Sequence, residues 1–514
     1  MTDAAPARGW HRLDPRMLAV TPLRQLTGFL PVIVIFLIAG GTRLDGRFYG
    51  VLAAVVAVVI AGIARWFTTR YRVTEERVEL RSGLLFRRRR SVPRDRIRTV
   101  DLTAGPVHRI FGLSVVNVGT GQRTEGTEAG ELSLDAVAAA EADRLRQRLL
   151  ERATDIPQPD ADTPPDQEIA RLDWSWLRFA PLTVSSLVAV GAVAGAGSQL
   201  AGDLGVDPSD IGELNGARQQ LETAPLWLGV ALFALLVLLV GLLGSVLLFI
   251  EAWWGYRLAR EPGGTLRVRR GALTTRSISL EERRLRGVEV AEPLLLRAGG
   301  GARLTAVATG LGGAKAEGRG TLLPPAPVAE AHRVSAAVLA EQPAPTTIAL
   351  RRHPPAARRR RLLRAVVPVA VLVALLWLLP VPGWLPWTAA TLLPVAVLLA
   401  LDAYRNLGHA LAGRYLVTRH GAAVRSTAAL QRSGVIGWTV SQSIFQRRSE
   451  LVTLAATTAA GSGAYAVYDV GTADGLALGE QVVPGLLAPF LTTAAAGDEA
   501  PDQEVLPGHR PFTK

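Results

Sequence analysis

Long apolar runs alternate with basic, strand-like segments along this chain, and the same order occurs three times. A helix needs about 20 apolar residues to cross the hydrocarbon core of a membrane. The windows that meet this criterion are 25–42, 48–65, 177–200, 224–250, 364–382 and 384–401. The pattern therefore predicts a multi-pass α-helical membrane protein with about six spans, paired as hairpins.

Each pair of apolar runs is followed by a segment that reads as several strands and one helix. These segments open at Tyr71, Tyr256 and Tyr415. In the first, Ser82-Gly83 is a turn signal between strand-like stretches, and Ser133 is a helix N-cap before a stretch rich in Ala, Leu and Arg. We therefore expect three α+β modules, each with antiparallel strands closed by a C-terminal helix.

The third module is the weakest copy of this pattern. Ala428 takes the place of the turn glycine, and the closing helix, expected at 479–492, contains Pro484 and Pro489. The first module keeps the full pattern, so we expect it to carry the main contact if only one module does.

These patterns divide the chain into consecutive segments. They are a cytoplasmic N-terminal segment (1–24), transmembrane hairpin 1 (25–65), module 1 (66–152), a flexible linker (153–170), transmembrane hairpin 2 (171–252) with an acidic outer loop (201–222), module 2 (253–342), a basic linker (343–363), transmembrane hairpin 3 (364–402), module 3 (403–495) and a disordered tail (496–514).

The distribution of arginine predicts the orientation of the spans. Arginines cluster before the first span, after the second and before the fifth, whereas the loop 201–222 is acidic. Because cytoplasmic loops carry an excess of basic residues, the N-terminus, the modules and the C-terminus are expected in the cytoplasm, in a cell (inner) membrane. The basic run before the fifth span is interpreted as topogenic and consists of Arg358, Arg359, Arg360 and Arg361.

Composition and charge exclude several classes of function. The chain has no cysteine, which rules out disulfides and thiol catalysis, and its histidines show no spacing typical of a zinc site. The interiors of the expected spans (25–42, 48–64, 179–202, 223–250 and 365–401) lack ionisable side chains, which argues against an ion-coupled pump. No catalytic motif occurs, and Gly310 to Lys315 fails the phosphate-loop pattern. We expect no enzyme activity, no cofactor and no metal.

The net charge of +13 indicates an anionic partner, and the apolar runs favour a lipid surface over nucleic acid. The candidate contact is the basic run Arg87, Arg88, Arg89 and Arg90 in module 1. Each arginine near an anionic leaflet contributes about 1 kcal/mol. The alternative interpretation of this run is a topogenic or merely solvated segment.

The order and repetition of short motifs resemble the bacterial pleckstrin-homology-like membrane proteins of the YdbS/YdbT type. The residues that carry the resemblance are Tyr71-Arg72-Val73-Thr74, Arg81-Ser82-Gly83-Leu84-Leu85, Val92-Pro93-Arg94-Asp95-Arg96-Ile97, Arg109-Ile110-Phe111-Gly112-Leu113, Val435-Ile436-Gly437-Trp438 and Phe445-Gln446-Arg447-Arg448. The resemblance implies a pleckstrin-homology (PH)-like fold for the modules, with a strongly bent sheet plugged by a helix. It implies no established biochemical activity.

Together these patterns predict a non-enzymatic integral membrane protein. Its PH-like modules would bind partner proteins or anionic lipid headgroups at the cytoplasmic face, in envelope maintenance or stress, and the protein could form a homo-oligomer. The alternative is a transporter or export component for an apolar or lipid substrate, with the modules as regulators.

Overall fold

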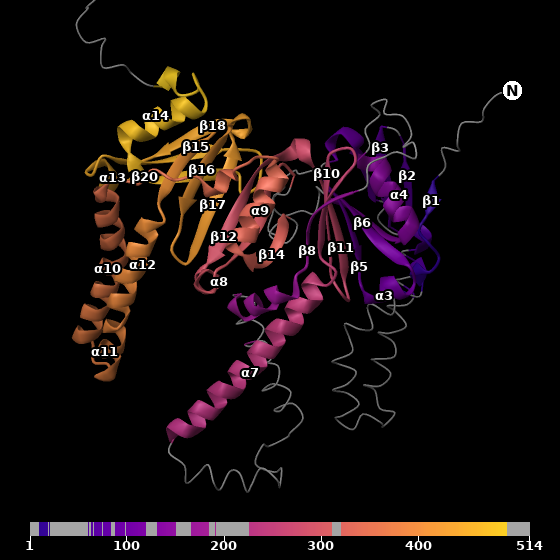
Figure 1. The fold of residues 1–514 in the computed structure, drawn as a ribbon. Helices are drawn as coiled ribbons and strands as arrows, with labels where there is room; N and C mark the ends of the chain where they lie inside the picture. Colours follow the sequence, from indigo (N-terminus) through magenta and orange to yellow (C-terminus); the bar gives the residue numbers. More distant parts are fainter. Residues whose placement is uncertain are drawn as a thin grey trace, which may run out of the picture.

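The computed structural model shows three sheet-rich modules beside one another, with long helices projecting from them (Figure 1). The structure describes residues 10–18, 20, 60, 63–64, 66–74, 76–83, 88–97, 99–119, 131–150, 166–183, 191, 226–310 and 320–490.

Module 1 consists of strands from two sheets and a closing helix. Its first strands are β1 (His11–Arg12), β2 (Arg70–Val73), β3 (Arg77–Ser82) and β4 (Arg88–Pro93). They are followed by β5 (Thr99–Ala104), α3 (Pro106–Ile110), β6 (Leu113–Gly119), β7 (Glu131–Ala138) and α4 (Ala139–Leu150). The core forms because α4 packs Ala142, Leu145 and Leu149 against alternate apolar residues of the strands.

Module 2 repeats this order after a helical entry. It contains β8 (Gln167–Arg171), the 3-10 helix η2 (Trp174–Leu182), α7 (Leu226–Trp253), β9 (Arg257–Glu261), β10 (Thr265–Arg270), β11 (Thr275–Glu281), β12 (Leu285–Pro293), α8 (Leu294–Ala298), β13 (Gly301–Ala308), β14 (Thr321–Pro327) and α9 (Val328–Leu339). Strand β8 covers the end of the segment that we predicted as a flexible linker and pairs with β9.

Module 3 follows three helices that form a hairpin. These are α10 (Pro355–Leu378), α11 (Trp384–Ala390) and α12 (Leu392–Arg405). The module contains β15 (Gly408–Ala412), β16 (Tyr415–His420), β17 (Val424–Gln431), β18 (Gly437–Ser441), α13 (Ile444–Arg447), β19 (Leu451–Thr457), β20 (Ala464–Gly471) and α14 (Thr472–Val482).

Our reading of module 3 was shifted by one strand. Tyr415 lies in β16, the second strand, and Ala428 lies inside β17 instead of in a turn. The turn glycine is Gly421, whose φ of 102° matches 110° at Gly83 and 108° at Gly271. A left-handed backbone conformation favours glycine, so the third module retains the turn signal that we considered lost.

Two of the sheets cross module boundaries. In the seven-stranded sheet, β5 of module 1 pairs antiparallel with β11 of module 2, and in the six-stranded sheet, β12 of module 2 pairs with β17 of module 3. Strands β1 to β4 and strands β18 to β20 form separate sheets at the two ends of the array. The second half of each module is therefore continuous with the first half of the next.

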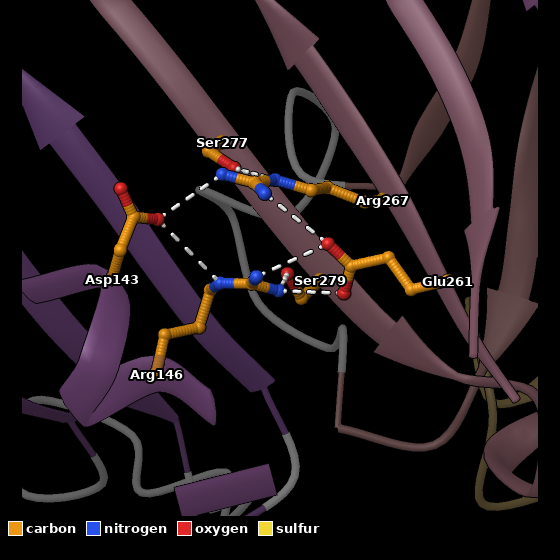
Figure 2. A network of polar contacts seen from close by, with 6 residues as sticks. All are labelled: Asp143, Arg146, Glu261, Arg267, Ser277 and Ser279. Atoms are coloured by element: carbon orange, nitrogen blue, oxygen red, sulfur yellow. Dashed lines mark hydrogen bonds and ion pairs between the residues drawn. The ribbon is translucent and has the colours of Figure 1, made fainter. Parts of the chain in front are cut away.

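A polar network reinforces the junction between modules 1 and 2. Figure 2 shows Arg146 of α4 reaching toward the strands of module 2. Its guanidinium donates to both carboxylate oxygens of Glu261, at 2.9 and 3.1 Å, and to Ser279 Oγ at 2.9 Å. Arg267 pairs with Asp143 of α4 at 3.2 Å. Because Arg146 is only 2% exposed, its charge is buried, and these hydrogen bonds take the place of those that it would make with water.

The prediction of a helical protein with about six spans is wrong for this structure. Among the described residues, two helices are long and apolar enough to cross a membrane, Pro355–Leu378 and Trp384–Arg405, and the shorter apolar helix Leu238–Trp253 forms part of α7. The windows 25–42 and 48–65 lie almost entirely outside the described residues. Most of the described chain builds the PH-like modules.

The window 177–200 shows why hydropathy alone misled us. Its described start belongs to η2, which buries Trp176, Phe179 and Ala180 in the core of module 2. Apolar composition there reflects packing against the module, which a hydropathy window cannot distinguish from contact with lipid. The rest of this window lies outside the described residues, apart from Gly191.

Candidate functional site: an apolar rim beside the long helices

One short helix occurs at the same place in every module, after the first strand of its second half. These helices are α3, α8 and α13, and each turns one side chain inward: His108, Leu296 and Gln446 are buried. These helices also carry large, exposed apolar side chains, which we call the rim: Ile110, Leu294, Leu295, Ile444 and Phe445. Phe445 is 72% exposed, although burying such a ring in a core stabilises a protein by about 1.5–3 kcal/mol.

The rim continues onto the hairpin turns of neighbouring modules. The Arg109 side chain of α3 donates to Ala272 O in the β10–β11 turn, and Leu294 N of α8 donates to Ala423 O before β17 at 2.7 Å. Leu273 and Val424, in or next to these turns, are also exposed. The short helix of one module therefore lies against the turn of the next, and their apolar side chains lie close together.

The rim adjoins the ends of the long apolar helices. At the end of α7, Glu251 O and Trp254 O accept hydrogen bonds of 2.8 and 2.9 Å from the β10–β11 turn. At the end of α12, Asn406 Nδ2 donates to Gly421 O at 2.9 Å. Trp174 and Trp254, both exposed, pack edge to face with ring centroids 5.4 Å apart. Exposed tryptophans beside an apolar helix are typical of a membrane–water interface.

Two arginine-lined cavities flank the end of α7. The first, of about 170 Å³, has polar lining residues Thr183, Ser245, Arg303 and Thr321 beside the apolar face of α7. Arg303 Nε is buried and has no hydrogen-bond partner among the described residues. Burial also lowers the pKa of Arg303 below its usual range. Arg303 is half-buried, and an anion in this cavity would supply the hydrogen-bond acceptor that its Nε lacks.

The second cavity lies between the end of α7 and the β10–β11 hairpin. It has a volume of about 180 Å³ and is lined by Glu251, Ala252, Arg270, Thr274 and Arg276. Burial lowers the pKa of Arg270 to about 10, and its guanidinium stacks over the Trp253 ring at 4.2 Å. Because Glu251 contributes negative charge here, the first cavity is the better anion site.

The four arginines proposed as a lipid contact do not form a uniform patch. Arg87 lies outside the described residues, and only the backbone of Arg88 is described, in β4. Arg89 is 56% exposed, but its guanidinium lies 2.8 Å from Glu79 Oε1. That hydrogen bond holds the pKa of the buried Glu79 below its usual range. Part of the cluster therefore compensates a buried carboxylate within module 1, and Arg90 has its own polar contact.

The basic run before α10 is divided between protein and solvent. Arg358 and Arg359 are exposed, whereas Arg360 and Arg361 both pair with the buried Asp469 of β20. Gln446 of α13 donates to the same carboxylate at 3.0 Å. Asp469 therefore joins the start of α10, the rim and the third sheet, while the topogenic role of the run stays a prediction.

Two buried histidines meet next to this junction. His353 Nε2 lies 3.1 Å from His409 Nδ1, and Asp469 O lies 3.2 Å from His353 Nδ1. Burial lowers the pKa of both imidazoles, and the pKa of His409 falls to about 4. Both rings are therefore neutral near pH 7.

The comparisons with known proteins agree with this architecture. The family model described as the bacterial PH domain matches residues 23–153, 214–342 and 361–479. The chain belongs to the bacterial PH domain family. This confirms the resemblance that the repeated motifs indicated.

Two relatives in Bacillus subtilis (strain 168) carry transmembrane names. The chain is 24% identical to the UPF0699 transmembrane protein YdbT over 452 residues, which is 83% of this chain and 88% of that protein. It is 32% identical to the UPF0699 transmembrane protein YdbS over 106 residues, 20% of this chain and 62% of that protein. No solved structure matches the chain. These similarities support membrane localisation of this bacterial PH domain protein.

Sequence reasoning missed both the rim and the unpaired arginine. The signal for the rim was present: an arginine is the fourth residue of α3, α8 and α13, at Arg109, Arg297 and Arg447, and large apolar residues lie near it. No comparable signal marks Arg303, because its isolation depends on the fold around α7.

Proposed function

We propose that this bacterial PH domain protein is a non-enzymatic membrane protein whose modules lie on the membrane surface and bind anionic lipid headgroups. Arg303 carries the proposal. Its buried Nε, without a partner among the described residues, lines a cavity whose opposite wall is the apolar face of α7. A phospholipid matches this arrangement because its phosphate is anionic and its acyl chains are apolar.

The rim supports the same orientation of the modules. Exposed apolar side chains on α3, α8 and α13 would enter the interfacial layer of the bilayer, while the long helices anchor the chain. The cavity beside α7 would then open at the depth of the headgroups. Cytoplasmic orientation, which the arginine distribution predicts, and a role in the envelope are further parts of the proposal.

The test compares lipid retention by Arg303→Gln with that of a matched surface variant. Full-length protein in nanodiscs that contain phosphatidylcholine and phosphatidylglycerol would be extracted with detergent, and the co-purified lipid quantified by mass spectrometry. Loss of one arginine contact of about 1 kcal/mol predicts about fivefold less retained phosphatidylglycerol. Arg352→Gln, which removes an exposed arginine, should retain as much as the wild type. Equal retention by both variants would contradict the proposal.

A further inference from the structure

The two junctions between modules use the same backbone register. At the first, Thr99 pairs with Leu280 and Leu102 with Ser277. At the second, Gly287 pairs with Leu430 and Val290 with Thr427. Strands β5, β12 and β18 are each followed by an equivalent short helix. Counting back from these helices aligns Leu102 with Val290, and their strand partners Ser277 and Thr427 are aligned in turn. One geometric rule therefore joins the second half of a module to the first half of the next.

Each end of the array carries half of such a junction. Strand β4 corresponds to β11 and β17 and is the last strand of its sheet, with β3 as its neighbour. Strand β18 corresponds to β5 and β12 and is the last strand of its sheet, with β19 as its neighbour. Among the described residues the outer edges of both strands are unpaired, and an unpaired edge is a template for another strand.

Burial distinguishes the ends from the internal junctions. Leu102 and Val290 are buried, whereas Val440, at the same position of β18, is 47% exposed. Ser279 is buried at the first junction, and Ser91, at the same position of β4, is exposed. The side chains that an internal junction covers are therefore uncovered at both ends.

The short helices give a second, independent comparison. Arg109 of α3 binds the hairpin turn of the next module, and Arg297 of α8 pairs with Asp402 of α12 at 2.8 Å. Arg447 holds the same place on α13 and is exposed. Among the described residues its side chain makes no ion pair or hydrogen bond, unlike Arg109 and Arg297.

The charges of the two ends are complementary. At the first junction the closing helix α4 contacts the next module through Asp143 and Arg146. The equivalent helix of module 3, α14, contains Asp474 and Glu480 and no basic residue. Strand β4 contains Arg88, Arg89 and Arg90, although Arg89 already pairs with Glu79 of its own module. An acidic helix following β18 would therefore approach a basic strand.

We infer that β18 of one copy of this chain pairs antiparallel with β4 of a second copy and continues the array head to tail. The shared register sets the predicted pairs as Gly437 with Val92, Thr439 with Arg90 and Ser441 with Arg88. A second copy is the occupant because this chain carries both complementary ends. Such a heterologous contact closes into a ring or extends as a filament, and it keeps every rim on the same side.

The pairing also accounts for the residues that disfavour other strands. Pro93, which lacks a backbone donor, lies just outside the predicted pairs. Arginines at an edge discourage association with a generic apolar strand. Both features disfavour a generic apolar strand, so the favoured partner is the end of the array that carries β18 and the acidic helix α14.

Disulfide cross-linking in membranes tests the register, because the natural chain has no cysteine. Arg94 N donates to Glu76 O at 2.9 Å, so by alternation the backbone of Arg90 faces β3. Arg90 and Thr439 would then form a non-hydrogen-bonded pair, whose side chains lie within disulfide distance. We expect the variant Arg90→Cys/Thr439→Cys to form a ladder or a closed set of covalent multimers on oxidation.

Ser91→Cys/Thr439→Cys is the matched control, because adjacent residues point to opposite faces of a strand. It should give at least tenfold less cross-linked product. A mixture of the two single variants Arg90→Cys and Thr439→Cys should stop at dimers, because each chain then has one reactive end. Equal cross-linking of both double variants, or none in either, would overturn the register.

The mass of the protein in mild detergent tests the assembly without cysteines. We expect a multimer whose mass, measured by light scattering, decreases in Ser91→Pro. By the same alternation the Ser91 N–H faces away from β3, so this proline removes an intermolecular bond and spares the β3–β4 pairs. A monomeric wild type at all concentrations would overturn the inference. Arg303→Gln should leave the mass unchanged, which separates this result from the lipid proposal.

Discussion

The two junctions between modules share a backbone register but differ in side-chain chemistry. The first depends on charge, with Arg146 enclosed between Glu261 and Ser279. At the second, Ser335 occupies the position of Arg146, and the ion pair moves to the strands, where Arg425 Nε donates to Glu292 at 2.9 Å. Backbone pairing therefore supplies a general way to join modules, and side chains determine which modules are joined.

Of the substitutions at the two junctions, removal of Arg146 should lower the free energy of unfolding the most. Arg146→Ala leaves Glu261 partly buried with Arg267 alone, and breaking a buried ion pair from one side costs about 3–5 kcal/mol. We expect the free energy of unfolding, measured by denaturant titration in detergent, to fall by about 4 kcal/mol. Arg144→Ala, two residues away on α4 and exposed, should change it by under about 0.5 kcal/mol. Similar losses in both variants would show that the network does not hold the junction.

Acid should weaken module 3 through its histidine pair. The pKa of His409 falls from 6.5 to about 4 on folding, so the unfolded chain binds the proton more tightly. The free energy of unfolding is therefore complete above pH 6.5 and decreases as the pH falls toward 4, by at most about 3 kcal/mol.

The variant His409→Gln isolates this contribution to the pH dependence. Gln cannot be protonated in this range, so the difference between the variant and the wild type should decrease as the pH falls. Thermal unfolding at pH 7 and pH 4.5 provides the measurement. Parallel stability curves for the two proteins would exclude the histidine as the cause.

The second junction should depend on its strand ion pair. Arg425→Ala leaves the carboxylate of Glu292, which is buried, without its guanidinium partner. We expect a loss of about 2 kcal/mol, smaller than for Arg146 because Arg425 is partly exposed. The double variant Arg425→Ala/Glu292→Ala should recover part of this loss in the same denaturant titration. A double variant that is less stable than Arg425→Ala would show that the unpaired charge of Glu292 does not cause the loss of stability.

Substitution of Arg89, on the edge strand β4 of module 1, should lower the free energy of unfolding the least. Arg89→Ala removes one partner of Glu79, but Arg72 remains 3.2 Å from the same carboxylate. The expected loss of unfolding free energy is about 1 kcal/mol. Arg77→Ala is the control, because its ion pair with Glu76 is exposed on both sides and should contribute almost nothing. An effect of Arg77 as large as that of Arg89 would contradict the assignment of Glu79 as the buried partner.

The order of strands within a module could be predicted because it is local. Alternation and turn glycines revealed the hairpins and the presence of a closing helix, and the repeats confirmed one another. The starts of two closing helices were predicted wrongly, because Ser133 lies inside β7 and α14 begins at Thr472 instead of at 479. Module 3 was misaligned because Tyr415 resembles Tyr71 although it begins the second strand. Composition carries no information about strand order, so only the pairing of β15 with β16 resolved it.

The features that depend on long-range packing could not be predicted. Nothing local indicates that β5 pairs with β11, because Thr275 at the start of β11 is 171 residues after Ala104 at the end of β5. Apolar composition also failed to separate η2, which is buried against the module, from a membrane span. In the candidate site, charge counting identified Arg87 to Arg90 but could not show that Arg89 already pairs with Glu79.

The continuous sheets have a consequence for how such chains evolve and can be cut. The unit that repeats in the sequence is not the unit that hydrogen bonds, because the paired unit starts halfway through one module and ends halfway through the next. Duplicating a gene for a protomer that already pairs with itself would turn a contact between molecules into one within a chain. Module number could then change by whole repeats without inventing a new interface. Excising one module at its sequence boundaries would instead cut through two sheets.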